Sequence, residues 1–274
     1  MPSISSAPVR RRIVGTSLKM YFDYCKTLEY VQDVVSLAAE YSEWPLLDAD
    51  GEQSLDMFVI PDFVSIVPIQ SILHASTTRF WVGAQDTFDV DTGPYTGEVS
   101  PVTLSQAGCA LVEIGHAERR RQFGETDEWV AQKAGAIVRN NMIPLVCVGE
   151  LTKDDVRAAV SECWQQLCGV FDAVPDSADV IVAYEPVWAI GMKKPAGAEH
   201  IVTVAQALRQ RCLAERPQRS DASLRIVYGG SAKPGLYEHI YHAVDGLFLG
   251  RFAHDPAMFL KAAQEVYAAG RGSV

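Results

Sequence analysis

The stretch that decides the fold is residues 180–191, VIVAYEPVWAIG, in which an apolar run ends in a glutamate that is followed at once by a proline. Val180, Ile181 and Val182 are typical of a strand that is buried on both faces, as in parallel sheets covered by helices. Glu185 stands directly after this strand, at the start of a loop, where α/β folds place functional side chains. The apolar residues that follow Glu185 are unusual for a loop exposed to water, so we expect them to cover something.

The same pattern recurs along the chain. Eight short runs rich in Val, Ile and Leu lie behind turn signals, and most segments between them have helical periodicity. Eight strand–helix units in 274 residues predict an α/β protein with a single closed (β/α)8 barrel rather than an open doubly wound sheet. No Pro/Gly/Ser-rich linker divides the chain, so we expect one barrel domain over 13–270, preceded by a loosely attached or disordered tail over 1–12, rather than two smaller domains. The eight runs are Ile13–Val14, Met57–Ile60, Phe80–Val82, Leu111–Ile114, Ile143–Val148, Val180–Val182, Leu224–Val227 and Leu247–Leu249.

Composition narrows the class of function. A formal net charge of -10 and a pI near 5.1 argue against nucleic-acid and membrane partners, but they allow a small anionic substrate in a local basic pocket. The six cysteines and six histidines show no metal-binding or disulfide spacing, and no Walker-type loop is present. We therefore expect no metal, no cofactor and reduced thiols. The chain shows no secretory signal and no apolar run of membrane-spanning length, so we expect a cytoplasmic protein.

If the barrel is correct, functional residues lie just after the strands, at the rim where the loops gather. Taken singly, each candidate has an ordinary structural explanation as a solvated charge, a rim histidine, a salt-bridge partner or a turn glycine. Taken together they supply a general base, a hydrogen-bond donor, a fixed positive charge and backbone N–H groups, which suit proton abstraction beside a carbonyl of a phosphorylated substrate. The candidates are Lys19, His116, Glu118, Glu185, Gly229–Ser231 and Gly250–Arg251.

Seven fragments in chain order resemble the triosephosphate isomerase family and cover nearly the whole predicted barrel. They are GTSLKM, VGAQDTFDVDTGPYTGEVSP, GHAERRRQFGET, PLVCVGE, AYEPVWAIG, VYGGS and DGLFLGR, between residues 15 and 251. The resemblance implies a TIM barrel and a cofactor-independent aldose–ketose isomerase. The leading expectation is interconversion of D-glyceraldehyde 3-phosphate and dihydroxyacetone phosphate, with a place in glycolysis and gluconeogenesis.

The resemblance also assigns catalytic roles. It makes Glu185 the base that moves a proton between two carbons through an enediolate, and His116 the neutral donor to the carbonyl oxygens. The neutral state is part of the resemblance, because triosephosphate isomerase is the known case in which a helix N-terminus lowers the pKa of a histidine. Lys19 would offset negative charge, and Glu118 would support the histidine and the lysine.

Binding and assembly follow from the same resemblance. The phosphate would be held by the backbone N–H groups of Gly191, Ser231, Gly250 and Arg251, near a helix end. The segment after Glu185 would be a mobile lid that expels water. The loop Asp91 to Glu98 would insert into a partner subunit, which predicts a homodimer.

Some positions depart from the family pattern, and they leave alternatives open. Ser17 stands where the family usually has asparagine, Arg251 replaces a glycine, and Ala117 replaces a serine beside the histidine. Ser17 and Arg251 resemble the branch that isomerises tetrulose phosphates, so L-erythrulose 1-phosphate is an alternative substrate, with Ser17 making room for one more carbon. A non-catalytic sugar-phosphate-binding barrel is an alternative of another class.

Overall fold

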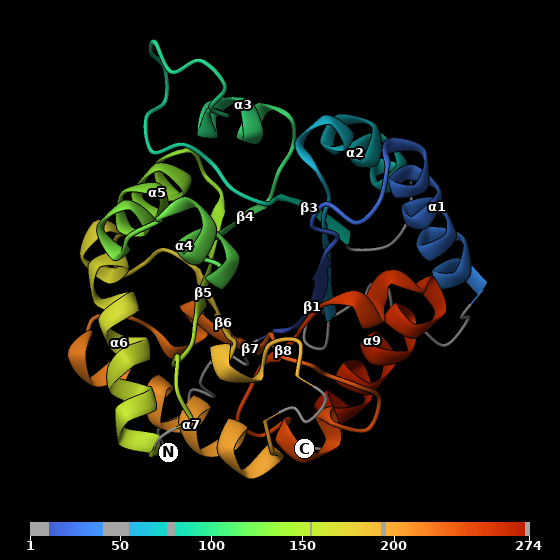
Figure 1. The fold of residues 1–274 in the computed structure, drawn as a ribbon. Coiled ribbons are helices and arrows are strands. Elements are labelled where there is room, and N and C mark those ends of the chain that lie inside the picture. The colour runs from blue at the N-terminus through green and yellow to red at the C-terminus, as the bar shows by residue number, and fades with distance from the viewer. Residues whose placement is uncertain (1–10, 41–54, 76–79, 154, 193–195, 272–274) are drawn as a thin grey trace, which may run out of the picture.

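The structure, a computed structural model, describes residues 11–40, 55–75, 80–153, 155–192 and 196–271. Its eight strands run parallel and form a closed barrel in chain order, with the last strand paired to the first. Figure 1 shows these strands enclosed by a ring of helices. The prediction of a single (β/α)8 barrel is therefore confirmed. The strands are β1 (Arg12–Ser17), β2 (Leu55–Ile60), β3 (Phe80–Ala84), β4 (Leu111–Ile114), β5 (Ile143–Val148), β6 (Val180–Tyr184), β7 (Leu224–Tyr228) and β8 (Gly246–Leu249).

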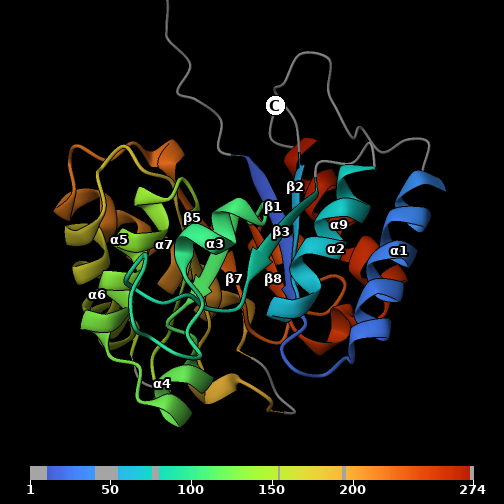
Figure 2. The same ribbon diagram turned by 90° about the horizontal axis from the view of Figure 1, so that it is seen from above.

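The helices fill the crossovers between strands, and Figure 2 shows that the short helix α4 lies at one end of the barrel. The predicted tail falls mostly on residues outside the described ranges, and Arg12 is the first residue of β1. The helices are α1 (Tyr24–Glu40), α2 (Ile66–His74), α3 (Pro101–Gln106), α4 (Ala117–Phe123), α5 (Asp127–Arg139), α6 (Val156–Ala173), α7 (Ala198–Glu215), α8 (Tyr237–Ile240) and α9 (Pro256–Arg271), with 3₁₀ turns η1 (Phe63–Ser65), η2 (Val187–Ala189), η3 (Asp221–Ser223) and η4 (Arg251–His254).

The alternation of side chains along each strand divides the core in two. Outward residues of the strands pack under the helices in one large apolar cluster. Inward residues fill the barrel itself, where Phe58 and Phe248 stack with ring centroids 5.7 Å apart. Gly15 makes room for this filling, because a Cβ there would lie 2.3 Å from the Phe58 ring. The barrel interior is therefore a packed core rather than a pore.

The end of the barrel at the strand N-termini is held by buried ion pairs. Arg225 in β7 donates to Asp56 in β2 over 2.9 Å, and both side chains are buried. Asp245 accepts from Arg209 and from the backbone N–H of Ile226. Polar groups at this end serve stability, which leaves the opposite end for function. Within the described ranges, no helix is both long and apolar enough to cross a bilayer.

Candidate active site

A cavity of about 390 Å³ lies at the carboxyl ends of the strands. Parallel strands that close into a barrel bring the loops after each strand to one rim, so residues far apart in the chain meet there. Every predicted site residue lines this cavity. These residues are Ser17, Lys19, His116, Glu118, Glu185, Gly191, Ser231, Gly250 and Arg251.

Lys19 follows β1 in a left-handed backbone conformation, with φ of 51°. A residue other than glycine rarely adopts this conformation, and such strain gathers at functional sites. Gln85 donates to the Lys19 carbonyl over 2.8 Å, which holds this turn in place. The Lys19 ammonium donates to Glu118 over 3.0 Å. Burial lowers the pKa of Lys19, but the surrounding carboxylates of Glu113, Glu185 and Glu118 outweigh this effect and raise it, so the side chain stays charged.

His116 caps the N-terminus of α4, and its ring is turned toward the cavity. Its Nδ1 accepts the backbone N–H of Glu118 over 3.1 Å. The neutral ring therefore carries its proton on Nε2, which faces Glu185 Oε2 at 3.3 Å. The Lys19 ammonium lies 3.0 Å from Nε2, but it is itself a donor and directs its hydrogen bond to Glu118. Burial lowers the pKa of His116, but the carboxylates of Glu185 and Glu113 outweigh burial and raise it.

Glu185 stands immediately after β6 with its side chain buried against His116. Its backbone N–H donates to the Val148 carbonyl over 2.8 Å, which extends the sheet by one bond past the end of the strand. Gly229 leaves room for the carboxylate, because a Cβ at that position would lie 2.3 Å from Glu185 Oε1. The base candidate is thus a buried carboxylate held close to a hydrogen-bond donor at the cavity.

Glu118 is the most exposed of the predicted catalytic residues, with 42% of its side chain accessible. Burial raises the pKa of Glu118, but the hydrogen bond and charge of Lys19 outweigh burial and lower it. Glu118 therefore stays ionised and holds the lysine beside the histidine.

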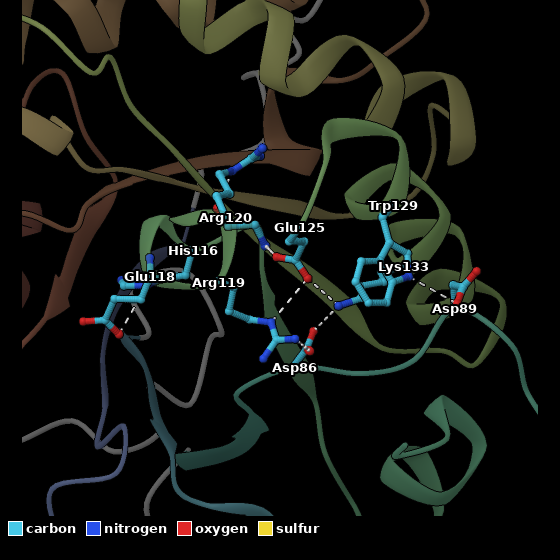
Figure 3. Close-up of polar contacts among 10 residues, drawn as sticks. Asp86, Asp89, His116, Glu118, Arg119, Arg120, Glu125, Trp129 and Lys133 are labelled. Atoms are coloured by element: carbon cyan, nitrogen blue, oxygen red, sulfur yellow. Dashed lines mark hydrogen bonds and ion pairs between the residues drawn. The ribbon is translucent and has the colours of Figure 1, made fainter. Parts of the chain in front are cut away.

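The loop that carries His116 is fixed from behind by a buried charge cluster, defined here as the Lys133 cluster, which contains Asp86, Arg119, Glu125 and Lys133 (Figure 3). The Lys133 side chain is buried and contacts both carboxylates of the cluster. Glu125 also accepts the backbone N–H of Gly115 over 3.0 Å, next to the histidine. The cluster therefore positions the histidine through the residue before it.

The carbonyl group of Gly115 is also held in place. Arg120 donates to the Gly115 carbonyl over 2.7 Å and pairs with Asp127 at 2.5 Å. Gly115 has φ of 70°, a backbone conformation that favours glycine. Because its N–H and its carbonyl are both hydrogen-bonded, this turn holds the next residue, His116, toward the cavity. The sequence analysis did not predict these contacts around Gly115, because the residues that make them come from separate loops and helices.

The segment after Glu185 is packed onto the barrel at its start and exposed at its tip. Trp188 in η2 donates through its indole N–H to Glu150 over 2.7 Å. Tyr184 donates to the same carboxylate over 3.2 Å. Beyond η2, Ile190 and Met192 are exposed, and Gly191 has φ of 72°.

Sequence reasoning also missed Glu113, which lies in the middle of β4 and lines the cavity. A charged residue inside an apolar strand was the signal that could have indicated it.

Comparison with known proteins identifies the family. The family model described as Triosephosphate isomerase matches residues 12–266. An L-erythrulose-1-phosphate isomerase of Pectobacterium atrosepticum is 43% identical over 261 residues, which are 94% of this chain and 96% of the relative. Proteins of the same name from Rhizobium rhizogenes (37% identical; 94% of this chain, 96% of the relative) and Rhizobium meliloti (36%; 92% and 96%) are also similar.

These relatives correct the leading expectation of substrate. The relatives described above are named for L-erythrulose 1-phosphate and not for triose phosphates, so the expected interconversion of glyceraldehyde 3-phosphate and dihydroxyacetone phosphate is wrong as the main interpretation. The place in glycolysis and gluconeogenesis that depended on it is not supported. The expectation of an isomerase enzyme acting on a sugar phosphate is confirmed, against the alternative of a non-catalytic barrel. The chain belongs to the triosephosphate isomerase family.

Proposed function

We propose that this enzyme isomerises L-erythrulose 1-phosphate by moving one proton between two adjacent carbons. One observation carries the proposal: a carboxylate, an imidazole and an ammonium group, from Glu185, His116 and Lys19, meet in one cavity at the barrel rim. Relatives named for this substrate align over more than nine tenths of the chain. Small Ser17 at the cavity wall agrees with a substrate longer than three carbons.

The chemistry of such a substrate fixes its product. L-Erythrulose 1-phosphate carries its carbonyl at C2, beside the phosphorylated carbon, and a hydroxyl at C3. Removal of the C3 proton gives an enediolate across C2 and C3, and return of the proton to C2 moves the carbonyl to C3. Numbered from the other end, the product is an erythrulose 4-phosphate. With this substrate the reaction interconverts two ketoses rather than an aldose and a ketose.

Each polar side chain has a role in this proton transfer. Glu185 takes the proton from C3 and returns it to C2, because it is a buried carboxylate that lines the cavity. His116 donates from Nε2 to the two substrate oxygens as negative charge develops on them. Lys19 stays charged and stabilises the enediolate, while Glu118 holds the ammonium in place.

In this proposal the phosphate binds at the side of the cavity formed by the loops after β6, β7 and β8. The backbone at Gly191, Ser231 and Gly250 lines this side, and Arg251 follows at the start of η4. An arginine guanidinium can grip a phosphate through two parallel N–H bonds. The exposed apolar tip of the lid, with Ile190, would cover the bound sugar and exclude water during the reaction.

We also propose a cytoplasmic homodimer with the loop Asp91 to Glu98 at its interface. Apolar side chains of Met20, Val64 and Tyr95 are exposed in the single chain, and the proposed partner subunit would cover them. Sedimentation equilibrium of the wild type and of Val64→Glu tests this assembly. We expect a dimer for the first and a shift toward monomer for the second, whereas a monomeric wild type would contradict the assembly.

The test of the proposed function is a steady-state assay of purified enzyme with L-erythrulose 1-phosphate, with dihydroxyacetone phosphate as the comparison substrate. We expect a higher kcat/KM for the tetrulose phosphate. Glu185→Gln should lower kcat by at least about 10²-fold, as expected for loss of a general base. Glu238→Gln, an exposed glutamate in α8 that does not line the cavity, is the matched control and should leave the rate unchanged. Absence of turnover of the tetrulose phosphate would refute the proposal.

A further inference from the structure

A second buried carboxyl, that of Glu113, lies at the floor of the cavity in addition to that of Glu185. Glu113 shares the inward face of β4 with Leu111, because residues two apart on a strand point the same way. Its side chain is 3% exposed and lines the cavity. Many of the other side chains that fill the barrel interior are apolar, among them Phe248, which also lines the cavity.

A carboxyl in this position needs a reason, because burying a polar group without hydrogen bonds is unfavourable. The nearby cationic groups have closer carboxylate partners: Lys19 donates to Glu118 at 3.0 Å, and His116 faces Glu185 at 3.3 Å. Burial raises the pKa of Glu113, and the positive charges of His116 and Lys19 only oppose that shift. Neither apolar packing nor a close ion pair therefore explains why a carboxyl is buried at this position.

A second polar group lies beside Glu113 in the cavity. Ser17 ends β1, is 3% exposed, and lines the same cavity. The Ser17 hydroxyl interacts with the Glu113 carboxyl and opposes the rise in the pKa of that carboxyl. Its oxygen has no other hydrogen-bond partner among the described residues. Two adjacent polar groups thus face the same end of the cavity.

We propose that Glu113 and Ser17 bind the terminal hydroxymethyl group of a four-carbon sugar phosphate and so determine substrate length. The inference rests on the proposed function. With the phosphate at Gly191, Ser231 and Gly250 and the reacting carbons between His116 and Glu185, the remaining end of the substrate points at the floor.

The chemistry of the two groups matches a hydroxyl. A hydroxyl donates one hydrogen bond and accepts others, and a carboxyl and a serine beside each other can satisfy both needs whichever of them carries the donated proton. A three-carbon substrate has no group at this position and leaves both buried side chains without a substrate hydroxyl to bind. A site built to hydrogen-bond a hydroxyl discriminates strongly against the analogue that lacks it.

The first experiment measures binding rather than turnover. Isothermal titration compares erythritol 4-phosphate with glycerol 3-phosphate, two unreactive analogues that differ by one CHOH group. The wild type should bind the four-carbon analogue more tightly. Glu113→Leu should reduce this preference by on the order of 10- to 100-fold, mainly by weakening the longer ligand. Glu113→Gln keeps hydrogen-bonding capacity and should retain most of it. Ser17→Ala should lose part of it, and the Ser17→Ala/Glu113→Leu double variant should lose no more than Glu113→Leu alone.

The alternatives give different results. If Glu113→Leu weakens both analogues equally, Glu113 acts through the charge of the site and the inference is overturned. If it changes neither, the floor does not bind the ligand. Thermal melting checks that each variant is folded, and Glu113→Gln is nearly isosteric should Glu113→Leu fail to fold. A wild type that prefers the four-carbon analogue but turns over no tetrulose phosphate would refute the proposed function and leave this inference standing.

Discussion

Replacement of Gly229 by alanine tests whether the position of the base is set by the glycine after β7. A Cβ at Gly229 would lie 2.3 Å from Glu185 Oε1 and 2.5 Å from its Cγ, whereas ordinary contacts begin near 3.4 Å. The carboxylate must therefore retreat by about 1 Å. A displacement of about 1 Å from the reacting geometry can cost roughly 10²-fold in rate. We expect Gly229→Ala to lower kcat on the tetrulose phosphate by about that factor.

Stability should change little, because the clash is with the end of a flexible side chain rather than with backbone. The assay is steady-state kinetics together with thermal melting. Gly169→Ala in α6 is the matched control: its Cβ would meet Ala131 at an ordinary 3.4 Å, and it lies away from the cavity. It should leave kcat unchanged. A folded Gly229→Ala enzyme with kcat within about threefold of wild type would refute the reasoning that a displacement of this size disables the base.

Three further predictions concern the surroundings of the site. Glu118→Gln removes the carboxylate whose pKa Lys19 lowers, so above about pH 4.5 the wild type should have a melting temperature higher than the variant by at most a few degrees. This difference in melting temperature should close as the pH falls through the lowered pKa of Glu118. A difference that grows in acid would contradict this prediction. Lys133→Met leaves the buried carboxylates of the Lys133 cluster without their cation and should cost roughly 3–5 kcal/mol of unfolding free energy in urea titration. Iodoacetamide at neutral pH should label exposed Cys25 and spare Cys147, whose burial in the barrel interior raises its pKa. Mass spectrometry of the peptides would show the opposite order if the barrel interior were open to the reagent.

Much of the site was predictable because the fold gathers strand ends. Once eight buried runs indicate a barrel, the residues directly after them must share a rim, whatever their distance in the chain. This is why the sequence predicts that Lys19, His116 and Glu185 lie together, although they belong to three different strand–loop junctions. In the structure they line one cavity. The choice of substrate was not available in the same way. Ser17 and Arg251 indicated a longer sugar phosphate only as an alternative, and the relatives reversed that order.

The sequence by itself determined the barrel, its strands and the residues at its rim, because the periodicity of apolar residues is a local property that survives folding. Only the tertiary structure decided what those residues contact. Glu113 faces the cavity because barrel closure turns one side of β4 inward, next to Ser17 of a distant strand. The Lys133 cluster joins groups whose separation in the chain says nothing about their distance in space. Contacts of this kind depend on strand register and loop packing, which are set by the whole chain at once.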